Sequence, residues 1–337
     1  MIKYIKKEIP IDVVITWVNG SDPDLKQKRA FFLEKEKSYS SHSSLNTRFE
    51  SKNEIEYCVG SILKFAPFVR NIFIITDGQA PKFSDIFKNH FSKGINSIKI
   101  IDHKEIFKGN EFCLPSFNSR SIESLLWKIN SLSDNFVYFN DDFFLIRPVK
   151  QKDWFVNGTP VLRGKWKSKP KIKLAYNTII KYIKKTILNS KNFLLRPNYY
   201  IGQWNAANKL GYIKKYFRVE HTPHPINKKT LKLFFSNNDK LLKKNISYRF
   251  RNYDQFNTVS LANNLELQNQ NIHISSIDGV YIYPVNRHKK YVEKKLNLCI
   301  SNENIKFLCI QSLDSAKKKD EKAIKVWLKS IIFKKTF

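Results

Sequence analysis

Residues 136–147 form an apolar run that is interrupted in its middle by Asn140, Asp141 and Asp142. Two neighbouring carboxylates inside a hydrophobic segment lose several kcal/mol of hydration unless a partner compensates them. A divalent cation, an arginine or a substrate phosphate can supply this compensation. Adjacent residues within a strand point to opposite faces, so both carboxylates can face one site only if a strand ends there. The segment therefore indicates an enzyme with phosphate chemistry at a strand end.

Three further polar clusters follow apolar, β-branched runs in the first half of the chain. They are residues 19–22 (Asn-Gly-Ser-Asp), residues 76–79 (Thr-Asp-Gly-Gln) and residues 102–103 (Asp-His). Each alone is typical of an ordinary turn, because Asn-Gly and Asp-Gly pairs are common there. On successive strands of one sheet, however, they converge with the Asn-Asp-Asp cluster at a single edge, where loops carry functional side chains.

The elements that must position these clusters alternate between strand and helix. Strands are expected at residues 11–17, 71–76, 95–101 and 136–140, and helices at 25–37, 53–65 and 118–129. This alternation predicts an α/β fold with a mostly parallel, Rossmann-like sheet and with ligands at the carboxyl ends of its strands. Residues 1–160 are expected to form this nucleotide-sugar-binding part.

The pattern changes after residue 160. Residues 161–315 are expected to complete the catalytic domain, and lysines around Ile179 and Ile183 predict a basic amphipathic helix over 164–195. Residues 316–337 read as a second basic amphipathic helix that contains Trp327. Such a helix either binds an anionic membrane surface or docks on the core with its lysines in water. The sequence favours neither alternative.

The composition adds a charge argument. The chain has 337 residues, of which 42% are hydrophobic, and its formal net charge is +31. This excess of positive charge favours an anionic partner such as nucleic acid, an anionic membrane or a polyanionic substrate. It contains no recognisable nucleic-acid-binding motif, so nucleic acid is not expected. The four cysteines lack metal-ligand spacing, no run is long enough to span a bilayer, and the amino terminus makes a poor signal peptide. We therefore expect a cytoplasmic protein, with the inner face of the plasma membrane as a candidate partner.

Residues 11–23, Ile-Asp-Val-Val-Ile-Thr-Trp-Val-Asn-Gly-Ser-Asp-Pro, resemble the first conserved region of the Stealth family. These are capsular polysaccharide phosphotransferases, related to the animal N-acetylglucosamine-1-phosphotransferase. A second region is similar over residues 48–148, a third over 221–225 and 249–254, and a weaker fourth over 304–310. The resemblance covers most of the chain in the family's order.

The resemblance implies a glycosyltransferase-A-like sheet with helical C-terminal additions. It also implies transfer of hexose 1-phosphate, expected to be N-acetylhexosamine 1-phosphate, from a UDP-sugar to a glycan hydroxyl with release of UMP. The product belongs to a capsular or cell-surface polysaccharide. A metal-dependent glycosyltransferase that releases UDP remains an alternative, as does a non-catalytic polyanion-binding protein.

The resemblance and the chemistry of the reaction together suggest site residues. Mg²⁺ or Mn²⁺ is expected on Asp141 and Asp142, and arginines are expected on the phosphates because their planar fork binds two oxygens. His221 is the candidate general base or leaving-group acid. The full set of catalytic candidates is Asp77, Asn118, Asn140, Asp141, Asp142, His221, Arg249 and Asp254. The substrate-binding candidates are Trp17, Asn19, Gly20, Ser21, Asp22, Arg48, Gln79 and Arg251.

Two positions depart from the family pattern. Bacterial members usually have Asp where this chain has Asn19, and a His is common where it has Arg120. Arg120 suggests a different or more anionic acceptor. His103 shares the ambiguity of His221, because it could serve in catalysis or only cap a helix, while Asp254 is expected to orient Arg251 or His221.

Overall fold

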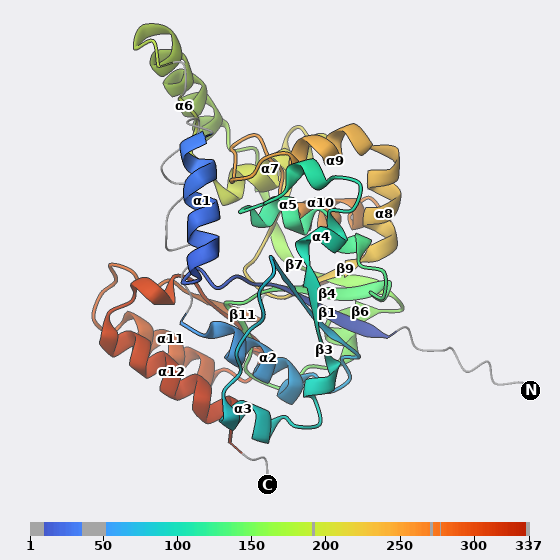
Figure 1. Ribbon diagram of the computed structural model, residues 1–337, viewed down its shortest axis with the longest axis vertical. Coiled ribbons are helices and arrows are strands. Elements are labelled where there is room, and N and C mark those ends of the chain that lie inside the picture. The colour runs from blue at the N-terminus through green and yellow to red at the C-terminus, as the bar shows by residue number, and fades with distance from the viewer. Residues whose placement is uncertain (1–9, 36–51, 191–192, 270–271, 277, 335–337) are drawn as a thin grey trace, which may run out of the picture.

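The computed structural model describes residues 10–35, 52–190, 193–269, 272–276 and 278–334. Its centre is a five-stranded sheet in the order β3-β2-β1-β4-β9 (Figure 1). Strands β1 (Ile11–Thr16), β2 (Ile72–Thr76), β3 (Ile98–Asp102) and β4 (Asn135–Asn140) are parallel, and β9 (His224–Asn227) is antiparallel to β4. The mostly parallel α/β sheet predicted from the sequence is confirmed.

The register of the parallel strands aligns their carboxyl ends. Thr16 of β1 lies opposite both Ile75 and Asn140, and Thr76 lies opposite Asp102. The polar clusters that follow these strands therefore meet at one edge of the sheet, as the sequence predicted. β4 ends at Asn140, so Asp141 and Asp142 occupy the turn beyond it.

Each face of the sheet is covered by helices because the buried strands are apolar on both sides. Alternate residues such as Val13 and Val14 enter two separate cores. One core lies against α2 (Glu54–Phe65), α3 (Asp85–His90), α11 (Tyr291–Ser301) and α12 (Lys318–Ile332). The other lies against α4 (His103–Ile106), α5 (Ser119–Glu123), α8 (Lys228–Asn237), α9 (Asp239–Ile246) and α10 (Thr258–Glu266). Figure 1 shows the first group below the sheet and the second above it.

Smaller sheets and helices complete the fold. A second sheet contains β6 (Phe155–Val156), β7 (Thr159–Ser168), β8 (Lys215–Val219) and β10 (His273–Ser275), and a third contains β5 (Phe143–Leu145), β11 (Gly279–Ile282) and β12 (Phe307–Ile310). Helix α7 (Tyr199–Lys209) packs beside α10 and contributes Ala206 to the second core. Helices α1 (Pro23–Lys35) and α6 (Lys171–Tyr182) lie outside both groups, and a π-helical turn (Ile183–Ile187) extends α6. The short 3-10 helices are Ile95–Ser97, Glu111–Cys113, Leu126–Lys128, Gln151–Asp153 and Leu313–Ser315.

Three predicted elements differ from the structure in extent. The helix expected over 118–129 is only α5 followed by a 3-10 turn, and the strand expected from residue 95 begins at Ile98. The basic helix expected from residue 164 begins at Lys171. Residues 164–168 instead pair with β8, and a Cβ on Gly164 would lie 2.4 Å from the carbonyl oxygen of Arg218. Strand pairing thus overrides the helical spacing of this stretch. The division of the chain at residues 160 and 315 stays a prediction, and β7 crosses the first position.

Helix α12 decides between the two alternatives for the C-terminal helix. Its apolar side, which includes Ile324, Leu328 and Ile332, is buried in the core next to α2. The side chain of Lys64 in α2 also donates hydrogen bonds of 2.7 Å to the carbonyl oxygens of Ile331 and Lys334. The helix docks on the core, and this face is not available to a membrane.

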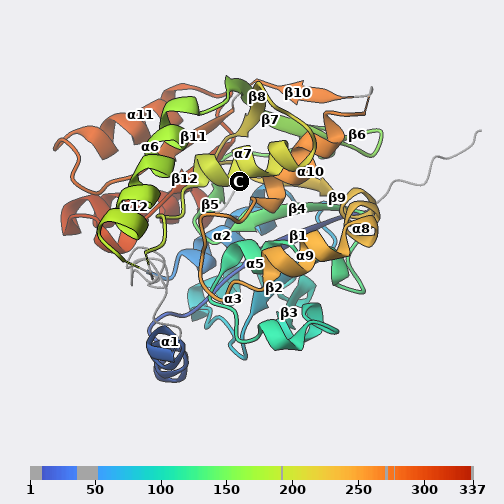
Figure 2. The same ribbon diagram turned by 90° about the horizontal axis from the view of Figure 1, so that it is seen from above.

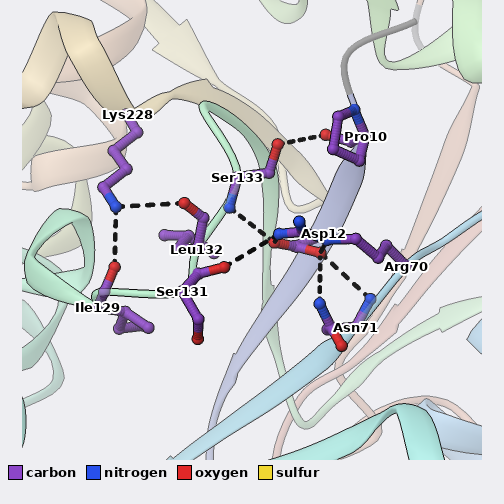
Figure 3. Close-up of polar contacts among 9 residues, drawn as sticks. All are labelled: Pro10, Asp12, Arg70, Asn71, Ile129, Ser131, Leu132, Ser133 and Lys228. Carbon is purple, nitrogen blue, oxygen red and sulfur yellow. Dashed lines mark hydrogen bonds and ion pairs between the residues drawn. The ribbon is translucent and has the colours of Figure 1, made fainter.

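A buried carboxylate joins the amino ends of the strands (Figure 3). Asp12 is fully buried and accepts hydrogen bonds from the guanidinium of Arg70 at 2.9 and 2.5 Å, from Asn71 N at 3.2 Å and from Ser133 N at 2.7 Å. These contacts link β1 to the starts of β2 and β4. Lys228 closes the neighbouring loop by donating to the carbonyl oxygens of Ile129 and Leu132.

Two sequence expectations about cysteines and membrane segments can be compared with the fold. All four cysteines, Cys58, Cys113, Cys299 and Cys309, are buried free thiols. Among the residues that the structure describes, no helix combines the length and the apolar character needed to cross a bilayer.

Candidate active site

A cavity of about 540 Å³ lies at the carboxyl ends of β1, β2 and β4. Its walls come from the whole length of the described chain, from Thr16 to Asp314. Seven of the predicted site residues line it: Trp17, Asp77, Asn118, Asn140, Asp141, Asp142 and Arg251. A parallel sheet places ligands at this edge, so the cavity is the candidate active site.

Of the five carboxylates that line the cavity, Glu54, Asp141 and Asp142 act on one another through their charges. Burial, followed by the charges of Asp142 and Glu54, raises the pKa of Asp141 well above its usual value. Burial and Glu54 raise the pKa of Asp142 to about 7. Mutual repulsion of this kind is relieved by a cation or by protonation. The sequence did not identify Glu54, because a glutamate in the first turn of a helix is a common feature with no functional meaning of its own.

The carboxylates can be tested as ligands of a divalent cation. Oδ1 of Asp142 is buried without a hydrogen-bond partner among the described residues, so an acceptor is left over for a ligand. The described part of the chain does not group three or more His, Cys, Asp or Glu side chains for metal binding. Mg²⁺ commonly takes only one or two carboxylates and completes its shell with phosphates and water. Asp141 and Asp142 fit that mode rather than a cage built only from protein.

Asn140 is held by a buried hydroxyl network. The Tyr138 hydroxyl contacts Thr16 Oγ1 at 2.9 Å and donates toward Asn140 Oδ1 at 2.8 Å, and Glu123 Oε1 lies 3.3 Å away. With its amide oxygen accepting from Tyr138, Asn140 keeps its amide nitrogen for the cavity. Burial raises the pKa of Glu123, while the positive charge of Arg251 opposes this rise.

Arginines form the positive part of the wall. Arg251 donates a 2.7 Å hydrogen bond to Ser119 Oγ, and its charge lowers the pKa of Asp142. Arg196, which the sequence did not single out, lines the cavity as well. Guanidinium groups opposite paired carboxylates can bind the oxygens of a pyrophosphate.

His103 is the histidine in the cavity wall. It is 6% exposed, and its Nδ1 has no hydrogen-bond partner in the described part of the chain. Burial lowers its pKa, and the charges of Asp77 and Asp102 partly oppose that shift. Asp102 itself caps α4 by accepting from Lys104 N at 2.8 Å. A neutral histidine with an unused ring nitrogen can accept a proton from a substrate.

His221, the base expected from the sequence, lies outside the cavity wall. Its ring stacks between Tyr199 and Tyr281 at centroid distances of 4.6 and 4.7 Å. Burial lowers its pKa. Tyr281 lines the cavity, so its ring lies between His221 and the cavity. The sequence could not reveal this order, because Tyr281 is distant along the chain.

Two other catalytic candidates also lie outside the wall. The guanidinium of Arg249 stacks over the ring of Phe32 at 4.7 Å and donates toward the carbonyl oxygen of Phe112 at 3.3 Å. Asp254 is exposed on the loop beyond Arg251. Arg249 and Arg251 flank Phe250, which is fully buried, in a stretch that is neither helix nor strand, so their spacing in the sequence does not fix which guanidinium reaches the cavity. Arg48 lies outside the described residues.

Residues 19–22 hold the loops next to the cavity through backbone hydrogen bonds and a helix cap. Asn19 N donates to Gln79 Oε1 at 2.9 Å, and Gln79 Nε2 donates back to the carbonyl oxygen of Asn19 at 3.2 Å. Asp22 Oδ1 accepts from Leu25 N at 2.9 Å and caps α1. None of the five polar candidates Asn19, Gly20, Ser21, Asp22 and Gln79 is part of the cavity wall. The pairs join the loops that follow β1 and β2.

Asn118 and Arg120 have their polar atoms occupied by protein. Asn118 Nδ2 donates to Tyr248 O at 2.8 Å and Gln255 Oε1 at 2.9 Å, while its Oδ1 caps α5. Arg120 is 4% exposed and donates to the carbonyl oxygens of Asn252 and Asn198. Arg120 therefore supports the segments that carry Arg251 and Arg196, and its guanidinium is directed at those loops rather than at an acceptor.

Comparisons with known proteins match two regions of this chain to one family. The model of Stealth protein CR1, conserved region 1, matches residues 10–37, and that of Stealth protein CR2, conserved region 2, matches residues 48–161. These segments contain Trp17, Asp77 and the Asn-Asp-Asp cluster of the cavity. The expected third and fourth regions stay predictions.

Several curated relatives match the same part of the chain. The capsular polysaccharide phosphotransferase fcs1 of Haemophilus influenzae is 44% identical over 147 residues, which are 44% of this chain and 38% of that protein. The exopolysaccharide phosphotransferase SCO6021 of Streptomyces coelicolor is 42% identical over 151 residues, 44% of this chain and 26% of that protein. The chain thus matches well under half the length of these relatives. Among solved structures, an active-site mutant of LgtC shares 11% identity with a TM-score of 0.42, over 94% of this chain and 95% of that chain.

Proposed function

The chain carries conserved regions 1 and 2 of the Stealth proteins within residues 10–161, and from this premise we propose that it is a sugar-1-phosphate transferase of polysaccharide synthesis. The donor is a UDP-sugar, with an N-acetylhexosamine as its sugar, and the acceptor is a glycan hydroxyl. The relatives named above are capsular and exopolysaccharide phosphotransferases, which supports the class of reaction.

The single observation that carries the proposal is the juxtaposition of charges in the cavity. Asp141 and Asp142 occupy the end of β4, and Arg251 and Arg196 line the same space. A pyrophosphate bridged between a carboxylate-bound divalent cation and guanidinium groups matches this pattern. Asp141 and Asp142 would hold Mg²⁺ or Mn²⁺, which supplies positive charge to the phosphate oxygens when bound.

The reaction follows from the geometry of the substrate. The acceptor hydroxyl attacks the phosphorus that carries the sugar, a new phosphorus–oxygen bond forms, and the bond from that phosphorus to the bridging oxygen breaks. UMP leaves with the bridging oxygen, and hexose 1-phosphate remains on the acceptor as a phosphodiester. Arg251 stabilises the charge on the transferred phosphoryl oxygens, and Asn140 orients one of these oxygens or the acceptor through its amide nitrogen.

Proton transfer falls to a histidine. His103 is our first candidate for the base that takes the acceptor's proton, because it lines the cavity with an unused Nδ1. Asp77 lies in the same wall and favours the protonated ring that results. His221 is the alternative base. Its ring stacks on that of Tyr281, which lines the cavity.

The decisive experiment measures the nucleotide that is released. The protein is incubated with UDP-N-acetylglucosamine, Mg²⁺ and an oligosaccharide acceptor, and the products are separated and examined by ³¹P NMR. Release of UMP with a phosphodiester in the product supports the proposal. Release of UDP with a phosphorus-free product would instead support a metal-dependent glycosyltransferase, and the absence of turnover with a panel of UDP-sugars would favour a polyanion-binding protein.

A further inference from the structure

Helix α6 presents an apolar face to water. Ile172, Tyr176 and Ile179 are spaced by four and three residues, so they lie on one side of the helix. Their exposed fractions are 89%, 62% and 56%. The helix contains no buried residue, and Ile187 and Leu188, just beyond it, are also exposed. An amphipathic helix normally turns this stripe toward a core.

The opposite side of α6 attaches it to the body. Leu174 packs against the cluster formed by Trp204, Ala207 and Tyr216, and Asn177 Nδ2 donates to the Tyr253 hydroxyl at 3.1 Å. Both residues lie about half a turn from the apolar stripe. The helix is therefore held with its apolar face directed away from the protein. Figure 1 shows α6 projecting from the body, and Figure 2 views the same helix from above.

The charge around the apolar face of α6 indicates what kind of partner it binds. Lys171 and Lys173 border the stripe on its two sides. The sequence from residue 154 to residue 219 contains no acidic residue at all. A second copy of this chain would bring the same positive charge, and a polyanion without apolar groups would leave the stripe in water. A surface that is both anionic and apolar satisfies both features.

We propose that α6 is an interfacial helix that binds an anionic phospholipid bilayer, with Ile172, Tyr176 and Ile179 inserted below the headgroups and the flanking lysines on the lipid phosphates. Tyr176 and Tyr182 suit the boundary between headgroups and acyl chains. The connection from α6 to α7 contains Arg196, a residue of the cavity wall, so this contact brings the cavity toward the membrane surface. The membrane contact is thus assigned to α6 and not to the C-terminal helix.

The test is co-sedimentation of the full chain with vesicles. We expect binding to vesicles of phosphatidylcholine and phosphatidylglycerol at about three to one, weakened by salt, and little binding to pure phosphatidylcholine. The double variant Ile172→Ser with Ile179→Ser should bind about tenfold more weakly. Lys171→Gln with Lys173→Gln should lose about fivefold per lysine.

Matched controls come from exposed residues elsewhere. Leu233→Ser with Ile300→Ser removes side chains that are 68% and 58% exposed on α8 and α11, and Lys240→Gln with Lys244→Gln removes two exposed charges on α9. Both controls should bind within about twofold of the wild type. If the Ile172/Ile179 variant does not fold by circular dichroism, Tyr176→Ser tests the same face.

Three outcomes would overturn the proposal. The first is a wild-type chain that ignores phosphatidylglycerol. The second is a control that loses as much binding as its α6 counterpart. The third is a lysine variant that loses binding while the isoleucine variant binds like the wild type, because charge alone would then mark α6 as a surface for a soluble polyanion such as polyphosphate.

Discussion

At the scale of single residues, the paired carboxylates at the end of β4 are unfavourable for the stability of the fold. Burial and like charge raise the pKa of Asp141 and Asp142, so the ionised forms destabilise the folded protein. Such a pair is retained in a cavity when its charge serves a ligand. Replacing either carboxylate by the isosteric amide separates these two effects, because it removes the charge and keeps the shape.

We expect Asp141→Asn and Asp142→Asn each to reduce UMP release at least about a hundredfold, because a cation ligand is lost. Neither variant should have a lower melting temperature. A carboxyl with a raised folded-state pKa costs stability as the pH rises, and the amide escapes that cost, so the variants should gain most at pH 8. Initial rates and thermal unfolding check both parts. Asp254→Asn, exposed outside the cavity, is the control, and normal rates in both cavity variants would remove the pair from the site.

The two arginines that flank Phe250 should differ. Arg251→Gln removes a guanidinium from the cavity wall, and we expect kcat/KM for the UDP-sugar to fall about tenfold to a hundredfold. Arg249→Gln changes a side chain stacked on Phe32, and we expect less than about a threefold effect on the same constant. Steady-state kinetics at saturating acceptor make the comparison. A greater loss in the Arg249 variant would contradict our placement of the donor.

A pH profile can identify the base. Burial lowers the pKa of His103, so the ring should stay neutral down to pH values below about 6.5, and activity should fall only below its pKa. His103→Gln should lower kcat about a hundredfold and remove this acidic limb. The same change found in His221→Gln, with His103→Gln unaffected, would transfer the role to His221.

At the scale of elements, the two ends of the central strands have different roles. Asp12 joins the amino ends of β1, β2 and β4 (Figure 3). The cavity lies at the carboxyl ends of these strands. Removing the Asp12 carboxylate would leave buried backbone N–H groups without an acceptor, whereas the Arg70 side chain, 43% exposed, can turn to water. This network therefore sets how well the strand ends align, without itself contacting a substrate.

Asp12→Ala should lower the free energy of unfolding by about 2–4 kcal/mol, because the backbone N–H groups of Asn71 and Ser133 lose their acceptor and each unsatisfied buried donor costs about 1–3 kcal/mol. Denaturant titration measures the change. Asp239→Ala, whose carboxylate pairs with Lys243 on the exposed side of α9, should cost less than about 1 kcal/mol. Equal losses in the two variants would mean that Asp12 contributes no more than a surface pair.

At the scale of the whole molecule, the net charge of +31 acts over distance. A positive protein attracts an anionic substrate before any specific contact forms, and dissolved salt screens this attraction. A glycan whose units are joined by phosphodiesters carries one negative charge per linkage. Under the proposed function, the lysine excess would help the protein hold such a chain.

We expect kcat/KM for an acceptor that contains phosphodiester linkages to fall severalfold between about 50 and 300 mM NaCl. A neutral oligosaccharide acceptor of the same length should lose little over this range. Initial rates with both acceptors at fixed UDP-sugar and Mg²⁺ make the measurement. Identical salt dependence for the two acceptors would show that the charge acts on the donor or on stability.

The sequence by itself determined the parallel sheet, the convergence of its polar clusters and the position of Asn140, Asp141 and Asp142 at that edge. Apolar runs that end in polar turns are local signals, and parallel strands must bring their carboxyl ends together. Only the tertiary structure decided which side chains reach the cavity. Glu54, His103 and Arg196 enter its wall, whereas His221, Arg249 and Asp254 lie outside it. It also decided that α12 is buried and that α6 is not, because the two helices share one pattern and only packing distinguishes their apolar faces.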